Sequence, residues 1–140
     1  MKRSREQMYP ETSTFHYYNA NPHKRITGDC VLRAVCTGLN IAYYDCMDML
    51  VNMSKKSGYS ILSKECVKKL LDEKGIPMQK QPRKMDNTKY TGVEFCKKIA
   101  QKDKRYIAHI GGGHMVAIVD KKVQDIWNST GGCIGNYWEI

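Results

Sequence analysis

The sequence predicts an α+β fold in which N-terminal helices pack on a C-terminal antiparallel β-sheet. Between residues 28 and 104, apolar side chains recur at helical spacing. After residue 104 the pattern changes to short β-rich runs separated by glycines or charged turns. Helices first and strands second are typical of the α+β class. The 140 residues suit one domain. We therefore expect a single domain over 1–140, with an N-terminal arm at 1–25, a helical part at 28–104 and the sheet at 105–140.

The first helix is expected to begin at Cys30. The dipeptide Gly28-Asp29 precedes an apolar, alanine-containing run that ends at Gly38. Aspartate is a favourable N-cap residue, and glycine commonly follows the last turn of a helix. We therefore expect Asp29 to cap this helix and Gly38 to stop it.

Three more helices are expected before the sheet. Apolar residues at helical spacing predict them over 43–54, 63–74 and 91–102. The last one opens with a capping box, in which Thr91 is followed three residues later by Glu94. Residues 76–90 contain two prolines and several cations, which indicates a basic connection with at most a short strand.

The second part of the chain predicts an antiparallel meander of four strands, over 105–110, 114–119, 123–127 and 134–138. A turn at residues 121–122 would pair Ile118 with Asp125. His114 and Asp125 would then share one face, because side chains alternate along a strand. A register shift of one residue would bring Asn128 to that face instead.

The chain carries a net charge of +9, and residues 55–104 contain 14 Lys/Arg against 6 Asp/Glu. Such a bias favours acidic partners, either nucleic acid or an acidic protein face. The same pattern also describes a solvated helix surface. No apolar run reaches the ~18–20 residues of a membrane helix, and the charged first eight residues do not resemble a secretory signal. We expect a cytoplasmic protein without a membrane partner.

The six cysteines have no Cys-x-x-Cys spacing, so the sequence predicts neither a zinc site nor another metal. In a reducing compartment most of them are expected to be small buried hydrophobic residues. Cys30 differs because it opens a predicted helix, where unpaired N–H groups and the helix dipole favour a thiolate. The carboxylate of the neighbouring Asp29 acts against that effect.

A thiol nucleophile needs a base within hydrogen-bond reach, and the base needs an orienting partner. The order Cys30, His114 and then Asp125 or Asn128 supplies these three roles. Arg33 lies one turn into the first helix among apolar neighbours, so it is expected to pair with an acid. A pairing with Asp125 would compete with the triad.

The two ends of the chain resemble papain-like cysteine peptidases. Gly28-Asp-Cys-Val-Leu-Arg-Ala34 is similar to their nucleophile helix, and His114-Met-Val-Ala-Ile-Val119 is similar to their histidine strand. Gln124-Asp-Ile-Trp-Asn-Ser129 looks like the following strand, which carries an acid or an amide. Compact members encoded by phages and Gram-positive bacteria are the most similar in style. The resemblance covers residues 19–40 and 105–138.

This resemblance implies that Cys30 is the nucleophile and His114 the general base. Asp125 matches the acid of bacteriocin-processing relatives, and Asn128 matches the amide of papain itself; we favour Asp125. Papain-like enzymes usually carry a glutamine about six residues before the cysteine, where this chain has Lys24. Asn19 or Asn21, together with the backbone N–H of Cys30, are therefore the candidate oxyanion donors.

The resulting hypothesis is a papain-like cysteine hydrolase, a peptidase or isopeptidase that works through a thioester acyl-enzyme and needs no cofactor. It would act on a protein or peptide, and the same groups would also serve deamidation or acyl transfer. A phage origin would place it in a bacterial or host-cell cytoplasm. The alternative is a non-catalytic binding or inhibitor module on the same scaffold, which uses the basic residues of 55–104 to hold nucleic acid or an acidic protein.

Three further features have two interpretations each. Gly111 to Gly113 indicate either close backbone approach by a substrate or a hairpin turn. Lys64, Lys68 and Lys69 share a helix face that either contacts phosphate or is simply solvated. Trp127 and Trp138 are expected in the core rather than on a binding surface.

Overall fold

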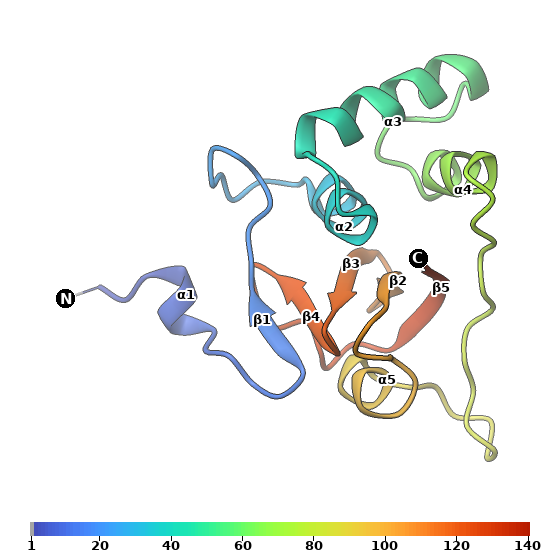
Figure 1. Ribbon diagram of the computed structural model, residues 1–140. Coiled ribbons are helices and arrows are strands. Elements are labelled where there is room, and N and C mark those ends of the chain that lie inside the picture. The colour runs from blue at the N-terminus through green and yellow to red at the C-terminus, as the bar shows by residue number, and fades with distance from the viewer. Residues whose placement is uncertain (1) are drawn as a thin grey trace.

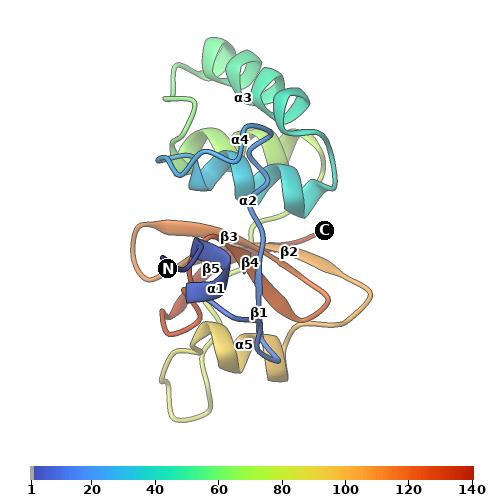
Figure 2. The ribbon, with the colours of Figure 1, turned by 90° about the vertical axis from the view of Figure 1, so that its left-hand side faces the viewer.

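The α+β class is confirmed by the computed structural model, which describes residues 2–140. Figure 2 shows the layers: α2, α3 and α4 lie on one side of the sheet, and α5 lies on the other. Over this range the helices are α1 (Arg5–Met8), α2 (Cys30–Leu39), α3 (Tyr43–Ser57), α4 (Lys64–Glu73) and α5 (Gly92–Lys98). The strands are β1 (Phe15–Tyr17), β2 (Arg105–Ile110), β3 (His114–Val119), β4 (Lys122–Asp125) and β5 (Ile134–Glu139).

The sheet is mixed rather than purely antiparallel. Its strand order is β1-β4-β3-β2-β5, so β2, β3 and β4 form the first three strands of the predicted meander. The fourth strand departs from the prediction, because β5 pairs antiparallel with β2 instead of with β4. The N-terminal arm adds β1, which pairs parallel to β4 with Phe15 opposite Val123 (Figure 1). The arm therefore contributes a strand that the sequence did not predict. The sequence did not reveal this strand because three residues are too few to show the alternation of polar and apolar side chains. The strand is held against the sheet by Phe15, whose side chain is completely buried.

The β3–β4 register differs from the predicted one by two residues. The turn consists of Asp120 and Lys121, both with positive φ (54° and 60°), rather than residues 121–122. A two-residue turn of this kind matches the twist of a hairpin. Ile118 consequently faces Val123 instead of Asp125. A shift of two preserves the face of every side chain, so Asp125 stays on the face predicted for it and moves closer to the start of β3, where His114 lies.

Helix α2 begins at Cys30, as predicted, but continues past Gly38. It ends at Asn40, whose backbone is left-handed with φ 56°. Gly38 is buried inside the helix, and a Cβ added there would lie 2.3 Å from Cγ1 of Ile107 on β2. The glycine thus serves close helix–sheet packing and not helix termination. Asp29 does precede the helix, but its side chain makes no capping hydrogen bond.

The remaining helices follow their local signals. Helix α3 ends before Gly58, which has φ 80°, and Ser63 caps α4 by accepting a hydrogen bond from the N–H of Cys66. The capping box of Thr91 and Glu94 is confirmed at α5, which ends at residue 98 rather than 102. The connection from α4 to α5 runs beside β5 and meets it at one bridge, between Gln79 and Tyr137 (Figure 1).

Both faces of the sheet are buried. One cluster of apolar side chains lies between the sheet and α2–α4 and includes Leu50, Val67 and Trp138. The other lies between the sheet and α5 and includes Phe95 and Ile118. No helix among residues 2–140 is long and apolar enough to cross a membrane.

Candidate active site

Cys30 occupies the first position of α2 and is half-buried. A carboxylate beside this sulfur would oppose its ionisation, but the carboxylate of Asp29 accepts hydrogen bonds from other side chains. Its oxygens accept from Nε of Arg33 at 2.8 Å and from the hydroxyl of Tyr43 at 2.8 Å. Burial raises the pKa of Asp29, but the hydrogen bonds, led by that of Arg33, lower it on balance. The negative charge next to Cys30 is therefore balanced by a guanidinium.

The ring of His114, at the start of β3, connects the two ends of the chain. The hydrogen bond between this ring and the thiol is the largest cause that lowers the pKa of Cys30, and the backbone of Met115 contributes another hydrogen bond. On its other side, Nε2 of His114 lies 2.6 Å from Oδ2 of Asp125. The structure thus brings Cys30, His114 and Asp125 together, in the order that the sequence predicted.

The surroundings of His114 favour its charged form. Burial alone would lower the pKa of the ring, but the hydrogen bonds with Asp125 and Cys30 raise it to about 9. The pKa of the thiol moves in the opposite direction. The two shifts together favour a thiolate beside an imidazolium at neutral pH.

Asp125 is completely buried and accepts hydrogen bonds at both oxygens. Oδ1 receives the backbone N–H of Ile126 at 2.8 Å and Nη1 of Arg33 at 3.0 Å. Oδ2 receives the hydroxyl of Ser129 at 2.7 Å in addition to His114. Burial raises the pKa of Asp125, but the hydrogen bond with His114 and the others lower it on balance. The group is a buried carboxylate with four donors.

Arg33 pairs with both candidate acids. Its Nε binds Asp29 and its Nη1 binds Asp125, and the side chain is almost fully buried. The expected competition with the triad does not occur, because Arg33 uses Oδ1 of Asp125 and His114 uses Oδ2. Arg33 therefore holds the carboxylate in place for the histidine.

Asn128, the alternative orienting residue, does not reach His114. Its side chain is exposed at a turn, where Oδ1 accepts from the backbone N–H and the hydroxyl of Thr130 at 3.1 and 2.5 Å. The prediction that either Asp125 or Asn128 faces the ring is thus resolved geometrically in favour of the aspartate.

The predicted oxyanion donors are used elsewhere. The side-chain amide of Asn19 donates to the carbonyl of Arg25 at 3.0 Å, and that of Asn21 donates to Asp29 at 3.1 Å. These bonds hold the loop before α2, and within residues 2–140 no hydrogen bond joins either amide to Cys30. Each amide thus uses one of its two N–H groups to hold this loop.

Trp127 lies at the site rather than in the core, contrary to the prediction. Its side chain is 40% exposed, whereas Trp138 is completely buried as predicted. The indole ring lies over His114 with 5.3 Å between ring centroids and an angle of 37° between planes. The short β4 explains the error, because Trp127 follows the strand and escapes its alternation. Ser129, which contacts Asp125, carried no recognisable sequence signal.

Comparisons with protein-family models, with curated proteins and with solved structures found no match. All six cysteines are free thiols. Within residues 2–140, no group of three or more His, Cys, Asp or Glu side chains is arranged to hold a metal ion. The chemistry available at the site is therefore described from its own side chains.

Proposed function

We propose that the protein is a cysteine hydrolase of the papain-like type that cleaves a peptide or isopeptide bond. The observation that carries the proposal is the position of the His114 ring, which binds the buried carboxylate of Asp125 at 2.6 Å and lies close enough to Cys30 to lower the pKa of its thiol. A nucleophile, a base and a group that orients the base are the minimum that this chemistry requires.

In the proposed reaction, the thiolate of Cys30 attacks the substrate carbonyl carbon and the carbonyl π electrons move to oxygen. The backbone N–H of Cys30 stabilises the resulting oxyanion, because the first N–H groups of a helix have no intrahelical partner. The imidazolium of His114 protonates the leaving amine as the C–N bond breaks, which leaves a thioester. Neutral His114 then removes a proton from water, and the hydroxide displaces the thiolate to release the acid.

Asp125 serves this cycle by fixing the ring. Its Oδ2 accepts from Nε2 of His114, so the proton on that nitrogen stays in place and the other nitrogen is left to exchange a proton with the sulfur and the substrate. The carboxylate also stabilises the imidazolium that exists before acylation. Asp125 is thus a positioning residue, and Cys30 and His114 are the proposed catalytic residues.

Alkylation rates test the proposal. Cys133 is exposed whereas Cys30 is half-buried, so exposure alone predicts that iodoacetamide modifies Cys133 faster. An activated thiolate should instead make Cys30 react more than about tenfold faster than Cys133 at pH 7. Mass spectrometry of the modified peptides measures both rates in one sample. The proposal fails if Cys30 reacts no faster than Cys133, or if replacement of His114 by glutamine leaves the rate of Cys30 unchanged.

A binding module is the second candidate, and the charge of residues 55–104 favours it. Only four of the 14 basic side chains in this range make ion pairs with carboxylates, namely Lys56, Lys68, Lys84 and Lys104. The others are available to an acidic protein or to nucleic acid. Affinity for a nucleic acid would fall steeply with added salt. The absence of binding to nucleic acid at low salt would exclude a nucleic-acid-binding module. The free thiols are compatible with a reducing cytoplasm for either candidate function.

A further inference from the structure

A cleft of about 660 Å³ is lined by His114 and by Val31, the residue that follows the nucleophile in α2. Cys30 itself is not one of the lining residues, so the cleft approaches the sulfur through these two neighbours. From there the cleft extends between β5, the start of α4 and the connection from α4 to α5, where Lys64, Lys89 and Asn136 line it. A substrate bound at the sulfur would therefore continue into this cleft.

The cleft is cationic. Lys64 and Lys89 are the lysines that line it, and no aspartate or glutamate does. Neither lysine forms an ion pair with a carboxylate within residues 2–140; Lys64 only approaches the amide oxygen of Asn136 at 3.4 Å. Two unpaired cations on the wall of one cleft create a positive potential that attracts an anionic group.

A histidine next to these lysines adds an unused polar atom. His109 lines the same cleft, and burial, with a smaller effect of Lys64, lowers its pKa to about 4. The ring is therefore neutral at pH 7. Its Nε2 is buried and has no hydrogen-bond partner in the part of the chain that the structure describes. The ring therefore adds no positive charge to the cleft, and the two lysines supply its potential.

The other side of His114 is apolar. A second pocket, of about 380 Å³, is lined by Trp127 and several glycines, and it shares Ile110, Gly111, Gly113 and His114 with the cationic cleft. The exposed indole supplies most of the side-chain surface that a bulky apolar group would contact. His114, the partner of Cys30, thus lines both a cationic cleft and an apolar pocket.

We propose that the substrate is an acidic peptide segment. An Asp or Glu side chain on one side of the scissile bond would lie between Lys64 and Lys89, and a bulky apolar side chain on the other side would pack against Trp127. This inference rests on the proposed hydrolase function. A peptide fits better than a nucleic acid because it supplies a carbonyl for the thiolate, an apolar side chain for the pocket and isolated carboxylates for two lysines separated by amides.

Two alkylating reagents of similar size and opposite electrostatic character test the charge of the cleft. Iodoacetate is anionic and iodoacetamide is neutral, so the ratio of their rates at Cys30 reports the local potential. The imidazolium of His114 affects this ratio equally in all variants that retain it. We expect the Lys64→Gln, Lys89→Gln double variant to lower the ratio by roughly threefold to tenfold at low salt. In 0.5 M salt the ratio of the native protein should fall towards that of the double variant, because salt screens the charges of the lysines.

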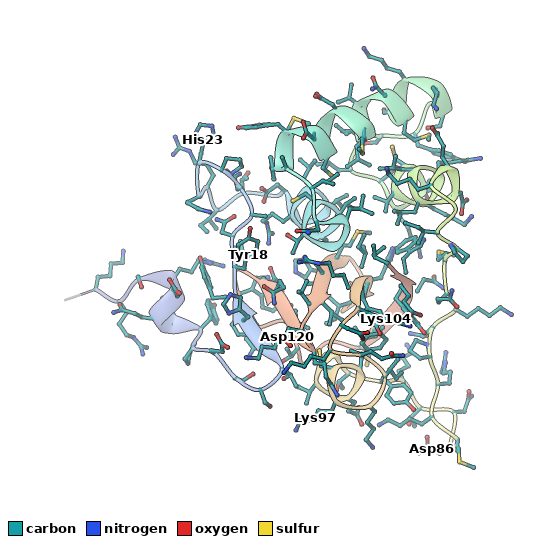
Figure 3. All side chains as sticks on the ribbon, in the orientation of Figure 1. Tyr18, His23, Asp86, Lys97, Lys104 and Asp120 are labelled. Carbon is teal, nitrogen blue, oxygen red and sulfur yellow. The ribbon has the colours of Figure 1, made fainter. Side chains whose placement is uncertain are left out.

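A matched control removes the same charge elsewhere. Lys97→Gln with Lys102→Gln changes two exposed lysines near α5, on the opposite side of the sheet from α2 and α4 (Figure 3 labels Lys97). Their loss should leave the ratio within about 1.5-fold of the native value, because the sheet separates these charges from the side of the molecule that carries α2 and α4. An equal fall in both double variants would overturn the inference, since only net charge would then matter.

Protection of Cys30 from iodoacetamide tests the peptide itself. The probes are the acetylated peptide Glu-Glu-Gly-Leu-Leu, its Gln-Gln counterpart and a twelve-residue oligothymidine. The glutamate peptide should protect at concentrations at least about fivefold lower than the glutamine peptide, and the Lys64→Gln, Lys89→Gln variant should abolish this preference. Equal protection by both peptides, or protection by the oligonucleotide alone, would overturn the inference. A fast Cys30 with an unchanged reagent ratio rejects only the acidic substrate, whereas a Cys30 no faster than Cys133 rejects the hydrolase as well.

Discussion

Replacement of Asp125 by asparagine should lower the fraction of Cys30 that is ionised to the thiolate, while the side chain keeps nearly the same size and shape. Four donors converge on the carboxylate: Arg33 and the N–H of Ile126 at Oδ1, and His114 and Ser129 at Oδ2. An amide can accept on one side only, because its NH₂ group must donate on the other. The guanidinium and the backbone N–H cannot become acceptors. The amide oxygen is therefore expected to turn towards them.

The NH₂ group of the new side chain would then face Nε2 of His114, and this nitrogen could accept only if it loses its proton. The pKa of His114 should fall from about 9 towards its ordinary value of 6.5. At about 1.4 kcal/mol for each pKa unit, the imidazolium loses roughly 3 kcal/mol of stabilisation. Because the thiolate depends on that imidazolium, the alkylation rate of Cys30 at pH 7 should fall on the order of 10²-fold.

The assay is the pH dependence of iodoacetamide alkylation at Cys30. The native protein should react nearly as fast at pH 6 as at pH 8, whereas the variant should accelerate with pH over the range of an ordinary thiol, about 8.5. Ser129→Ala is the matched control, because it removes one donor and retains the carboxylate; its rate should stay within about fivefold of native. Urea unfolding verifies that each variant is folded. An Asp125→Asn protein that is folded and keeps the native pH profile would refute this reasoning.

Three other changes have defined outcomes. Gly38→Ala should lower the free energy of unfolding by about 1–2 kcal/mol in a urea titration, because the clash with Ile107 outweighs the gain in helix propensity; a more stable variant would contradict this. Asn128→Ala should leave the alkylation rate of Cys30 within about twofold of native, and a fall beyond tenfold would give Asn128 the orienting role. Cys30→Ser retains Asp125, which raises the pKa of His114, so the ring's contribution to stability is complete below pH 6.5 and is lost as the pH rises through the raised pKa. Its unfolding free energy should therefore fall over that range, and adding His114→Gln should remove the slope.

Local signals predicted α2, α3, α4 and α5, but not α1, which lies in the segment expected to be an arm. The start of α2 at Cys30 and the capping box at Thr91 depend on residues within one turn, and both were found as expected. Gly38 was misread because a glycine that permits close packing and a glycine that ends a helix look alike in sequence. What distinguishes them is Ile107, which lies far away along the chain.

The site could be predicted in its members but not in its geometry. Cys30 and His114 were recognisable from the helix start and the strand that follows three glycines. The choice between Asp125 and Asn128 required the pairing register of β3 and β4. That register depends on the turn at Asp120, which contains no glycine to mark it in the sequence. Arg33 illustrates the same limit, because only the three-dimensional arrangement reveals that it and His114 use different oxygens of one carboxylate.

The charge of the His114 ring at neutral pH tests the account most directly. Nitrogen-15 chemical shifts of the histidine side chains can be measured at pH 7.5, with His114→Gln used to assign the signal among the four histidines. Both ring nitrogens of His114 should carry protons in the native protein, and the ring should become less basic in Cys30→Ala. A neutral ring at pH 7.5 in the native protein would contradict the proposed thiolate–imidazolium pair.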